Sequence, residues 1–346
     1  MRIALIHTRI TRKGGLETRL LNYQKYFAEK GHSVYIYTVK YDRSIQLERR
    51  TKVIQVPVRF IPRVFRALAF QWYLKLREDV SIFDFTLSLE RTAVQDRLIA
   101  PNTHKGYLNA RRQSRNHLTD YIQLYLDKIS YKRAVRIYAC SQMIKNEIIS
   151  YYSIPESKIV VLHPPLQTQT FHTSQDPQSL QQFREKWGID ITKKNFAFVS
   201  TSHRTKGLDL LIDIFKKPEM SSYHLWIAGS RAETGFSNIH TLGFVQHPEY
   251  LYASVNALLH PAIYEPFGQI VSEALACGIP AFVSDQTGAS ELIEPHTGLV
   301  LSRKDPLAWE NAILHFDSSN YSIPENWAFQ HKLDLESHMK ILLAPL

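Results

Sequence analysis

Residues 258–280, with the sequence LLHPAIYEPFGQIVSEALACGIP, decide the fold that this chain is expected to adopt. The apolar run 257–259 is typical of the end of a buried strand. Residues 269–277 have the apolar spacing of a helix, which Gly278 and Pro280 would end. Gly268 is therefore expected at the N-terminus of that helix, where unpaired N–H groups and the positive end of the helix dipole favour an anion.

Two carboxylates accompany this expected anion site: Glu265 in the turn before the helix and Glu273 within the helix. Carboxylates repel a phosphate, so they suit the site only if they bind hydroxyl groups instead. A nucleotide sugar offers both groups, because its diphosphate joins two hydroxyl-rich sugars. A helix with an ordinary acidic first turn would explain Glu273, but it would not explain Glu265 followed by residues 266–268.

The fixed positions of this stretch resemble the donor-site motif of the retaining, family-4 glycosyltransferases with the GT-B fold. The matching residues are Glu265-Pro266-Phe267-Gly268, Glu273-Ala274, Ala276, Gly278 and Pro280. The resemblance implies that Glu273 binds the ribose hydroxyls, that Glu265 lies near the donor sugar, and that the backbone after Gly268 contacts sugar and phosphate. We therefore include three neighbours among the donor-binding residues: Phe267, Gln269 and Ile270.

The composition is that of a soluble globular protein, with 44% hydrophobic and 21% charged residues. A chain of 346 residues suits two domains better than one. The two cysteines, Cys140 and Cys277, provide neither a disulfide framework nor metal-ligand spacing, which fits a reducing compartment. The apolar run after Met1 is too short for a signal peptide, and no run approaches the roughly 18 residues of a membrane span. We therefore expect a cytoplasmic protein.

The charge is unevenly distributed between the two halves of the chain. Residues 1–165 contain 29 Lys and Arg against 13 Asp and Glu, a formal charge of +16, whereas residues 166–346 have a formal charge of −6. This excess indicates an anionic partner for the first half, which could be nucleic acid, an anionic membrane or a phosphorylated glycolipid.

A basic amphipathic helix is predicted over residues 63–77. Its apolar face and its basic rim consist, respectively, of Phe65, Leu68, Ala69, Trp72 and Leu76, and of Arg63, Arg66, Lys75 and Arg77. We expect the apolar face to pack on the sheet, and the basic rim to remain available to an anionic membrane. Peripheral attachment to the cytoplasmic face of the inner membrane is therefore an alternative to a freely cytoplasmic location. Arg111, Arg112 and Arg115 are further basic candidates for such a partner.

The first domain opens with a predicted strand, Gly14-Gly15, a helix and a second strand, which form a βαβ unit. A simple helix-opening turn would explain the two glycines equally well. The family resemblance favours a loop that faces the donor phosphates. Residues 99–108 are interpreted as a loop that resembles a segment of the lipopolysaccharide-core-like branch, with Ala100-Pro101-Asn102 in place of its glycines. The resemblance implies that His104 in this loop contacts the donor sugar and helps to organise the reaction centre.

The second domain opens with a predicted strand at 196–200 and a loop at 201–207 that contains Arg204 and Lys206. A basic loop after a parallel strand suits a diphosphate, although an exposed basic turn is the simpler interpretation. The resemblance assigns Lys206 to the diphosphate. The arginine that the family has about six residues before this lysine is Ser200 here, so we assign Arg204 as its substitute. Phe244 lies in a segment that resembles the one stacking on the nucleotide base.

We therefore expect an α/β protein of the GT-B class, with two Rossmann-like doubly wound domains facing a central cleft. The expected domains are an acceptor-side domain at 1–165, a nucleotide-sugar-binding domain at 166–323, and a C-terminal helix at 324–346 that returns to the first domain. The expected activity is the transfer of a sugar from a nucleotide-diphosphate sugar to a saccharide or glycolipid acceptor, with retention of configuration, in cell-envelope polysaccharide or lipopolysaccharide synthesis. The catalytic candidates are His104, Lys206 and Glu265.

We expect no metal and no cofactor, because Lys206, Arg204 and the helix N-terminus can neutralise the leaving diphosphate, and because the chain has no D-x-D motif. Two alternatives remain. A sugar-nucleotide epimerase of the same fold would use the same donor site. A nucleic-acid-binding protein would explain the basic first half, but no basic-aromatic module supports it, so we expect no nucleic acid as partner. The sequence does not identify the base, the sugar or the acceptor.

Overall fold

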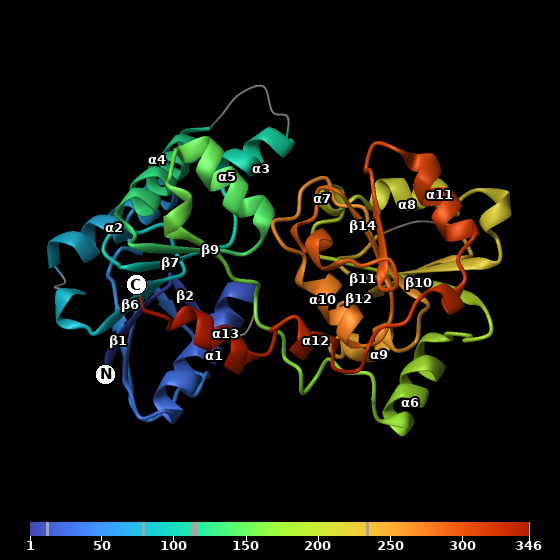
Figure 1. Cartoon of the computed structure of the whole chain (residues 1–346), viewed down its shortest axis with the longest axis horizontal. Coiled ribbons are helices and arrows are strands. Elements are labelled where there is room, and N and C mark those ends of the chain that lie inside the picture. The colour runs from blue at the N-terminus through green and yellow to red at the C-terminus, as the bar shows by residue number, and fades with distance from the viewer. Residues whose placement is uncertain (12–13, 78–79, 112–116, 233–234, 346) are drawn as a thin grey trace. The chain divides into compact units, whose positions relative to one another are not determined.

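The computed structural model describes residues 1–346 except 12–13, 78–79, 112–116, 233–234 and 346. The chain forms two compact units. Unit 1 contains Met1–Pro164 and Met339–Leu346, and unit 2 contains Pro165–His338. Each unit is a parallel sheet with helices packed against it (Figure 1).

The main sheet of unit 1 has the strand order β5-β3-β1-β6-β7-β8-β9 within the described residues, and every neighbouring pair is parallel. In this order the strands are Thr51–Gln55, Ser33–Thr38, Arg2–Ile6, Phe85–Ser88, Arg97–Ala100, Arg136–Ala139 and Ile159–Val161. The unit also has a two-stranded sheet of β2 (Arg9–Ile10) and β4 (Lys40–Tyr41). Its helices are α1 (Gly15–Glu29), α2 (Arg66–Arg77), α3 (His104–Arg111), α4 (Leu118–Arg133) and α5 (Gln142–Tyr152).

The sheet of unit 2 has the strand order β12-β11-β10-β13-β14-β15, again with parallel pairs. In this order the strands are Ile239–Gly243, Tyr223–Gly229, Lys194–Ser200, Ala257–His260, Ala281–Ser284 and Gly298–Leu301. The helices are α6 (Pro177–Trp187), α7 (His203–Lys206), α8 (Leu208–Phe215), α9 (Pro248–Tyr252), α10 (Gln269–Ala276), α11 (Pro306–Leu314) and α12 (Trp327–Gln330). The predicted doubly wound architecture of both domains is confirmed.

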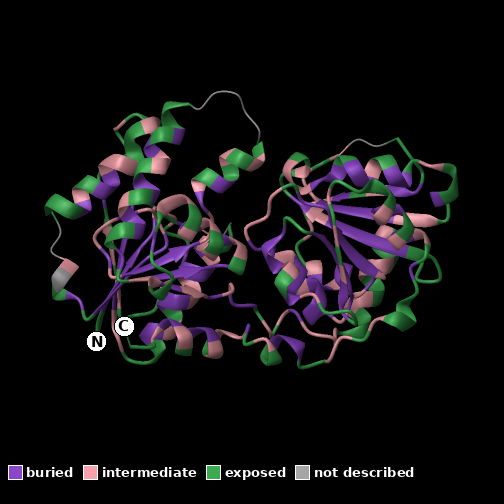
Figure 2. Ribbon diagram, turned by 45° about the horizontal axis from the view of Figure 1, so that its top comes forward, coloured by how far each residue is buried: buried purple, intermediate pink, exposed green. Residues whose placement is uncertain are grey.

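The central strands are buried on both faces, which explains why they are continuous apolar runs rather than alternating ones. Residues 3–6 of β1 and 257–260 of β13 are all fully buried. Figure 2 shows that the central strands of both sheets are almost wholly buried, while the helices turn an exposed side outward. In unit 2 the core under the sheet is formed by large side chains of strands and helices together, among them Phe196, Phe198, Phe215, Phe282 and Trp309.

The direction of strand order reverses once in each main sheet, between β1 and β6 in unit 1 and between β10 and β13 in unit 2. Ligands of open α/β sheets bind outside the carboxyl ends of the strands at such a reversal. The loops after β1, β6, β10 and β13 are therefore where functional side chains should lie.

The end of the chain differs from the expected single helix. Residues 324–346 contain α12 and α13 (Leu335–Leu342), and only the part from Met339 onward belongs to unit 1. Met339 and Leu342 are fully buried there, and the hydroxyl of Tyr138 donates a hydrogen bond of 2.9 Å to the Leu342 carbonyl. The returning segment thus begins at residue 339 rather than 324.

The expectation that the apolar face of residues 63–77 packs on the sheet is wrong. Residues 63–65 form a short 3-10 helix, and α2 buries Phe70, Gln71 and Leu74 instead. Phe65, Trp72 and Leu76 are exposed. The segment is apolar on nearly all sides, so its periodicity fits two different buried faces, and the packing of Phe70 and Leu74 into the core selects one of them. Within the described residues, no helix has the length and apolarity needed to cross a membrane.

Candidate active site

The loops that follow β10 and β13 in unit 2 pack directly against each other. The backbone N–H of Ile263 donates a 3.0 Å hydrogen bond to the carbonyl of Thr205. Gly207 has a φ of 82°, and a Cβ there would lie 2.0 Å from the carbonyl oxygen of Pro261. Glycine is therefore required at this close approach, which brings the end of α7 to the start of the loop that contains Glu265.

Three side chains meet at this point. The Nζ atom of Lys206 lies 2.6 Å from Oε2 of Glu265, and Nε2 of His260 lies 3.4 Å from the same oxygen. Burial alone would raise the pKa of Glu265, but the interactions with His260 and Lys206 outweigh it and lower the pKa to about 2. The carboxylate is thus ionised throughout the neutral range. Of the three, only His260 is absent from the sequence-based candidates.

The backbone of the Glu265 loop is fixed by the loop after β14. The N–H of Glu265 donates to the Gln286 carbonyl at 2.9 Å, and the carbonyl of Glu265 accepts from Gly288 at 2.8 Å. Gly268 has a φ of 94°, and a Cβ there would lie 3.1 Å from Cγ of Glu265 and 3.2 Å from Cγ2 of Thr287. The turn therefore places Glu265 only because residue 268 has no side chain.

The residues after Gly268 begin α10 as predicted. Gln269 and Ile270 are its first two residues and are half-buried, and the N–H groups of the first two residues of a helix have no intrahelical partner, whereas the N–H of Val271 donates to the Gly268 carbonyl at 2.9 Å. Phe267 differs, because its side chain is buried in the unit and its carbonyl accepts from the N–H of Ala289 at 2.7 Å. The ring and the carbonyl of Phe267 are therefore both engaged within the unit, which does not support its assignment as a donor-binding residue.

Glu273 lies one turn into α10 and is half-buried. Its Oε2 accepts a 3.0 Å hydrogen bond from the hydroxyl of Tyr252, which is fully buried. Burial raises the pKa of Glu273, the hydrogen bond from Tyr252 opposes that rise, and the nearby charge of Glu249 adds to it, so that the pKa reaches about 7. Glu273 therefore changes its charge near neutral pH, whereas Glu265 does not.

Among the described residues, no hydrogen bond or ion pair joins Arg204 or Phe244 to the cluster of Lys206, His260 and Glu265. Arg204 is exposed on α7. Phe244, which follows β12, has 82% of its surface exposed. An aromatic ring with that exposure is free to stack on a planar ligand, but the structure does not place it beside Glu265.

In unit 1, Gly14 and Gly15 begin α1 as predicted. Gly14 has a φ of 113°, and a Cβ there would lie 2.2 Å from Oε2 of Glu17. The carboxylate of Glu17 thus occupies the space beside the helix N-terminus, where it interacts favourably with the helix dipole. Arg9 holds the other oxygen of Glu17 at 3.2 Å.

A buried histidine lies at the reversal of strand order in unit 1. His7 follows β1 directly, and its Nδ1 lies 3.1 Å from Oε1 of Glu90, which follows β6; its Nε2 lies 3.8 Å from Oε1 of Glu17. Burial lowers the pKa of His7, but its interactions with the carboxylates of Glu17 and Glu90 outweigh burial and raise the pKa to about 9. The same contacts and the hydrogen bonds from Thr8 outweigh the effect of burial on Glu90 and lower its pKa to about 2.

His104 is the first residue of α3, so the predicted loop at 99–108 is in fact the end of β7 and the start of a helix. Two aspartates of α4 fix it. The N–H of His104 donates to Oδ2 of Asp127 at 2.8 Å, and Nε2 of the ring lies 3.0 Å from Oδ1 of Asp120. The side chain is mostly buried. The structure therefore positions the imidazole but leaves its contact with a sugar as a prediction.

Sequence reasoning missed His7, Glu90 and His260. Each histidine stands at the carboxyl end of a buried apolar run, where a polar residue is conspicuous. That position alone could have identified His7 and His260 as candidates. It could not have identified Glu90, because nothing local shows that β6 neighbours β1.

Two family models together span most of the chain. The model described as Glycosyltransferase Family 4 matches residues 13–170, and the model described as Glycosyl transferases group 1 matches residues 180–328. A protein of Burkholderia thailandensis named as a probable transglycosylase is 26% identical over 84% of this chain and 80% of its own length. The lipopolysaccharide glucosyltransferase WaaG of Escherichia coli K12 is 22% identical over 91% of this chain and 94% of its own.

Solved structures show the same fold. A crystal structure of WaaG matches with a TM-score of 0.76 and 18% identity, covering 97% of this chain and 93% of that one. The Anabaena protein HepE, in complex with UDP and glucose, matches with a TM-score of 0.72 and 15% identity, covering 99% of this chain and 98% of that one. The predicted GT-B fold is thereby confirmed. The chain is a glycosyltransferase that belongs to Glycosyltransferase Family 4 in its first half and to the group 1 glycosyl transferases in its second, as the motif at 265–280 indicated.

Proposed function

We propose that this glycosyltransferase transfers a sugar from a nucleotide-diphosphate sugar to a saccharide or glycolipid acceptor, with retention of the anomeric configuration. The observation that carries the proposal is the arrangement of Lys206, His260 and Glu265 at the reversal of strand order in unit 2, beside the N-terminus of α10. It combines a cation and first-turn N–H groups, which suit a diphosphate, with a carboxylate that is ionised and suits sugar hydroxyls.

The proposed roles follow from these contacts. Lys206 and the start of α10 neutralise the departing diphosphate, with Arg204 as a second cation. Glu265 binds the donor sugar, Glu273 binds the ribose, and Phe244 stacks on the base. In unit 1, His104 contacts the donor sugar, and Gly14 and Gly15 face the donor phosphates. Because the protein's own cations supply the charge stabilisation, the reaction needs no metal ion or cofactor.

A nucleotide-sugar screen followed by product analysis tests the proposal. UDP-, GDP- and ADP-sugars are compared by thermal shift, and UDP-glucose is tested first because HepE was solved with UDP and glucose. Transfer is then measured with and without EDTA, and the anomeric configuration of the product is read by NMR. Retention without a metal supports the proposal. An inverted product would contradict the retaining mechanism, and release of an epimerised sugar without any acceptor would instead establish an epimerase.

We further propose that the acceptor belongs to a cell-envelope saccharide or lipopolysaccharide and that the enzyme reaches it on an anionic membrane. The similarity to WaaG, named as a lipopolysaccharide glucosyltransferase, supports the first part. The second rests on a surface of unit 1, which we call the basic aromatic surface. It consists of Phe65, Trp72 and Leu76 with Arg63, Lys75 and Arg77, and of Leu118, Tyr121 and Tyr125 with Lys128 and Lys132 on α4, all exposed.

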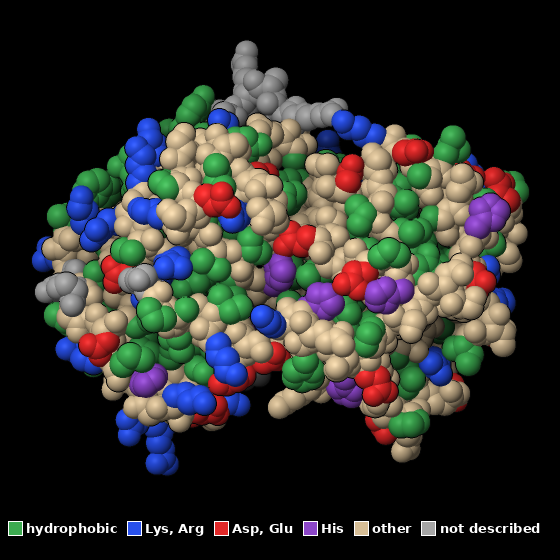
Figure 3. Space-filling model, viewed as in Figure 1, with side chains coloured by type: hydrophobic (Ala, Val, Ile, Leu, Met, Phe, Trp, Pro, Cys, Tyr) green, Lys and Arg blue, Asp and Glu red, His purple; other side chains and the backbone are tan. Residues whose placement is uncertain are grey.

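The two parts of this surface are neighbours, because residues 63–65 pack beside α4 (Figure 1). Figure 3 shows many Lys and Arg side chains gathered with hydrophobic ones on the side of unit 1 where α2 lies. Exposed aromatic residues ringed by basic ones suit the interface of an anionic bilayer better than a neutral one. Of the other basic candidates, Arg111 is exposed, while Arg112 and Arg115 lie outside the described residues.

A further inference from the structure

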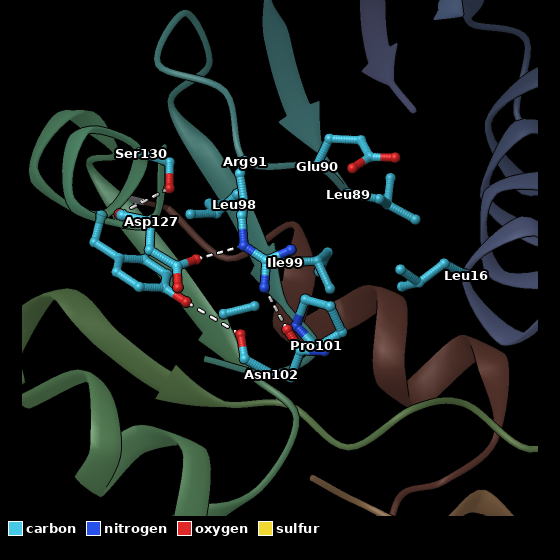
Figure 4. A pocket seen from close by; sticks show the side chains of 12 residues that line it. Leu16, Leu89, Glu90, Arg91, Leu98, Ile99, Pro101, Asn102, Asp127 and Ser130 are labelled. Carbon is cyan, nitrogen blue, oxygen red and sulfur yellow. Dashed lines mark hydrogen bonds and ion pairs between the residues drawn. The ribbon is translucent and has the colours of Figure 1, made fainter. Parts of the chain in front are cut away.

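Unit 1 contains a pocket of about 90 Å³ at its reversal of strand order. Its walls come from the start of α1 and from the residues that follow β6 and β7, and α4 closes one side (Figure 4). The lining residues that the argument uses are Leu16, Leu89, Glu90, Arg91, Asn102 and Asp127. The position is where a doubly wound sheet binds a ligand, and the known donor-site motif lies in the other unit.

The positive charge in the pocket, that of Arg91, is balanced by the carboxylate of Asp127. Nε of Arg91 donates to Oδ1 of Asp127 at 2.6 Å, and Nη2 donates to Oδ1 of Asn102 at 2.5 Å. Asp127 is fully buried and also accepts from the hydroxyl of Tyr152. A guanidinium has five N–H donors, of which these contacts use two. Arg91 can therefore still donate to a neutral oxygen, but its charge is already balanced by a carboxylate.

The negative charge of Glu90 is matched in the same way. Among the described residues, its carboxylate contacts are all made by Oε1, which accepts from the N–H and hydroxyl of Thr8 at 3.2 and 2.5 Å and lies 3.1 Å from His7. The second oxygen of the carboxylate remains available to a hydrogen-bond donor. His7 and Glu90 form an ion pair throughout the neutral range, because the pKa of His7 is raised to about 9 and that of Glu90 is lowered to about 2.

These facts select the chemistry of the occupant. A phosphate would lie beside the carboxylate of Glu90 and would find no unmatched cation, so it is disfavoured. A hydroxyl group can donate to Glu90 and accept from Arg91, while Leu89 beside Glu90 and Leu16 on the α1 side offer contact to C–H groups (Figure 4). The pocket has room for several water molecules, which suits the hydroxymethyl edge of a sugar ring.

We propose that this pocket binds an uncharged sugar unit of the acceptor, with Glu90 accepting hydrogen bonds from its hydroxyl groups. The assignment to the acceptor rests on the proposed function, which gives the diphosphate of the donor to unit 2. Glu90 is then a substrate-binding residue, and His7 is a positioning residue that fixes its carboxylate.

The test measures binding of methyl α-D-glucopyranoside, methyl α-D-galactopyranoside and methyl α-D-mannopyranoside to the full chain by saturation-transfer NMR, with saturating UDP present. At least one glycoside should bind with a millimolar Kd. Glu90→Gln should weaken that binding at least about 10-fold, because a charge-assisted hydrogen bond is lost. The matched control is Glu17→Gln, which removes the other carboxylate next to His7 but does not line the pocket; it should change the Kd less than about 2-fold. Inorganic phosphate at equal concentration should not displace the glycoside.

Leu16→Trp guards against a Glu90 variant that fails to fold. Leu16 is a member of neither ion pair, so a tryptophan there fills the pocket while both pairs are retained; it should abolish glycoside binding while thermal unfolding stays cooperative. The proposal is overturned if no glycoside binds, so that the cavity holds water only, if Glu90→Gln and Glu17→Gln act alike, if phosphate competes, or if Leu16→Trp still binds. UDP, GDP and ADP are titrated in the same samples by calorimetry. Binding of one of them alongside any of those outcomes refutes the pocket assignment alone, whereas binding of none refutes the proposed function.

Discussion

The Nζ atom of Lys206 lies 2.6 Å from Oε2 of Glu265, so the cation assigned to the diphosphate is paired with a carboxylate. This pairing limits how much Lys206 can add to the binding of a donor, because its charge is already partly compensated. When the diphosphate departs, negative charge builds up and the attraction to Lys206 grows. The contribution of Lys206 should therefore appear mainly in the transition state.

Lys206→Ala should lower kcat by about 100-fold and change KM for the donor much less, since removal of one preorganised charge from a transition state typically has an effect of that size. Steady-state kinetics with the donor identified by the nucleotide-sugar screen measures both constants. Lys216→Ala is the control, because Lys216 is an exposed lysine paired with Asp213 on the same unit. A change confined to KM would show that Lys206 acts only in ground-state binding.

His260→Gln should lower the stability of the protein near neutral pH and make that stability depend less on pH in the acidic range. The pKa of Glu265 is lowered from 4.5 to about 2 in the folded state, so its interactions stabilise the fold above pH 4.5 and are lost as the pH falls toward 2. Removal of the histidine raises the folded pKa and reduces that stabilisation. Thermal unfolding from pH 2 to 7 should show a lower Tm at pH 6 and a smaller decline of Tm below pH 4.5. An unchanged profile would mean that His260 does not hold the Glu265 carboxylate.

Gly268→Ala separates backbone strain from displacement of Glu265. Gly268 and Gly31 both have a positive φ, 94° and 83°, but a Cβ at Gly31 meets nothing within 4 Å, whereas one at Gly268 meets Glu265 and Thr287. Each alanine should destabilise the fold by about 1–2 kcal/mol through strain. Only Gly268→Ala should also lower kcat/KM, because it moves the Glu265 side chain. Denaturant unfolding and kinetics on both variants measure the two effects, and equal activity of the two would refute the link to Glu265.

Glu273 should make nucleotide affinity depend on pH near neutrality. Its pKa is raised from 4.5 to about 7. The carboxylate form, which accepts hydrogen bonds from ribose hydroxyls, is populated only as the pH rises through 7, so affinity should increase from pH 6 to 8. Tyr252→Phe removes the hydrogen bond that holds the pKa down and should shift this rise to higher pH. Calorimetry across that range measures the effect.

Glu273→Gln provides the complementary measurement. It should abolish this pH dependence and weaken nucleotide binding by about 1.5–3 kcal/mol. The ionised carboxylate favours nucleotide binding but disfavours folding. A carboxyl group with a raised folded pKa destabilises the fold progressively as the pH rises from 4.5 through 7. The variant should therefore gain Tm relative to the original protein at pH 8 and not at pH 4. Unchanged nucleotide affinity at pH 8 would contradict the assignment of Glu273 to the ribose.

The sequence predicted the parts of the site that lie in one continuous stretch. Gly268, Gln269 and Glu273 stand at the start of α10 as the pattern of 258–280 required, since turn chemistry and helix periodicity are local. Lys206 and Glu265 were both assigned to the donor site, but their ion pair depends on β10 lying next to β13, which only the sheet order reveals. The pair His7 and Glu90 was missed for the same reason, because it needs β1 beside β6.

Periodicity could not predict which face of α2 is buried, because residues 67–76 are apolar on most sides. Phe70 and Leu74 fill the core beside β1 and β3, and this leaves Trp72 and Leu76 exposed. Arg66 also has a local structural role that its charge does not reveal. Its guanidinium donates to the carbonyls of Ile61 and Arg59 at 2.8 and 2.9 Å, so it ties the preceding turn to the helix. A test of membrane binding should therefore leave Arg66 unchanged.

Unit 1 should bring the protein to anionic vesicles through the basic aromatic surface. Each basic side chain near such a surface contributes roughly 1 kcal/mol, so reversing Arg63, Lys75 and Arg77 to Glu should weaken binding by at least about 3 kcal/mol, or more than about 100-fold. The matched control reverses three exposed lysines of unit 2: Lys186, Lys193 and Lys304. It changes the net charge equally, so it separates a local surface from general attraction.

Trp72→Ala with Leu76→Ala should weaken the salt-resistant part of binding, with Leu307→Ala and Phe329→Ala as exposed controls. Co-sedimentation with phosphatidylglycerol and phosphatidylcholine vesicles at 50 and 500 mM salt measures all five proteins. Equal binding to both lipids, binding to neither, or equal loss in the two charge-reversed variants would remove the membrane from this enzyme's function and leave a soluble acceptor.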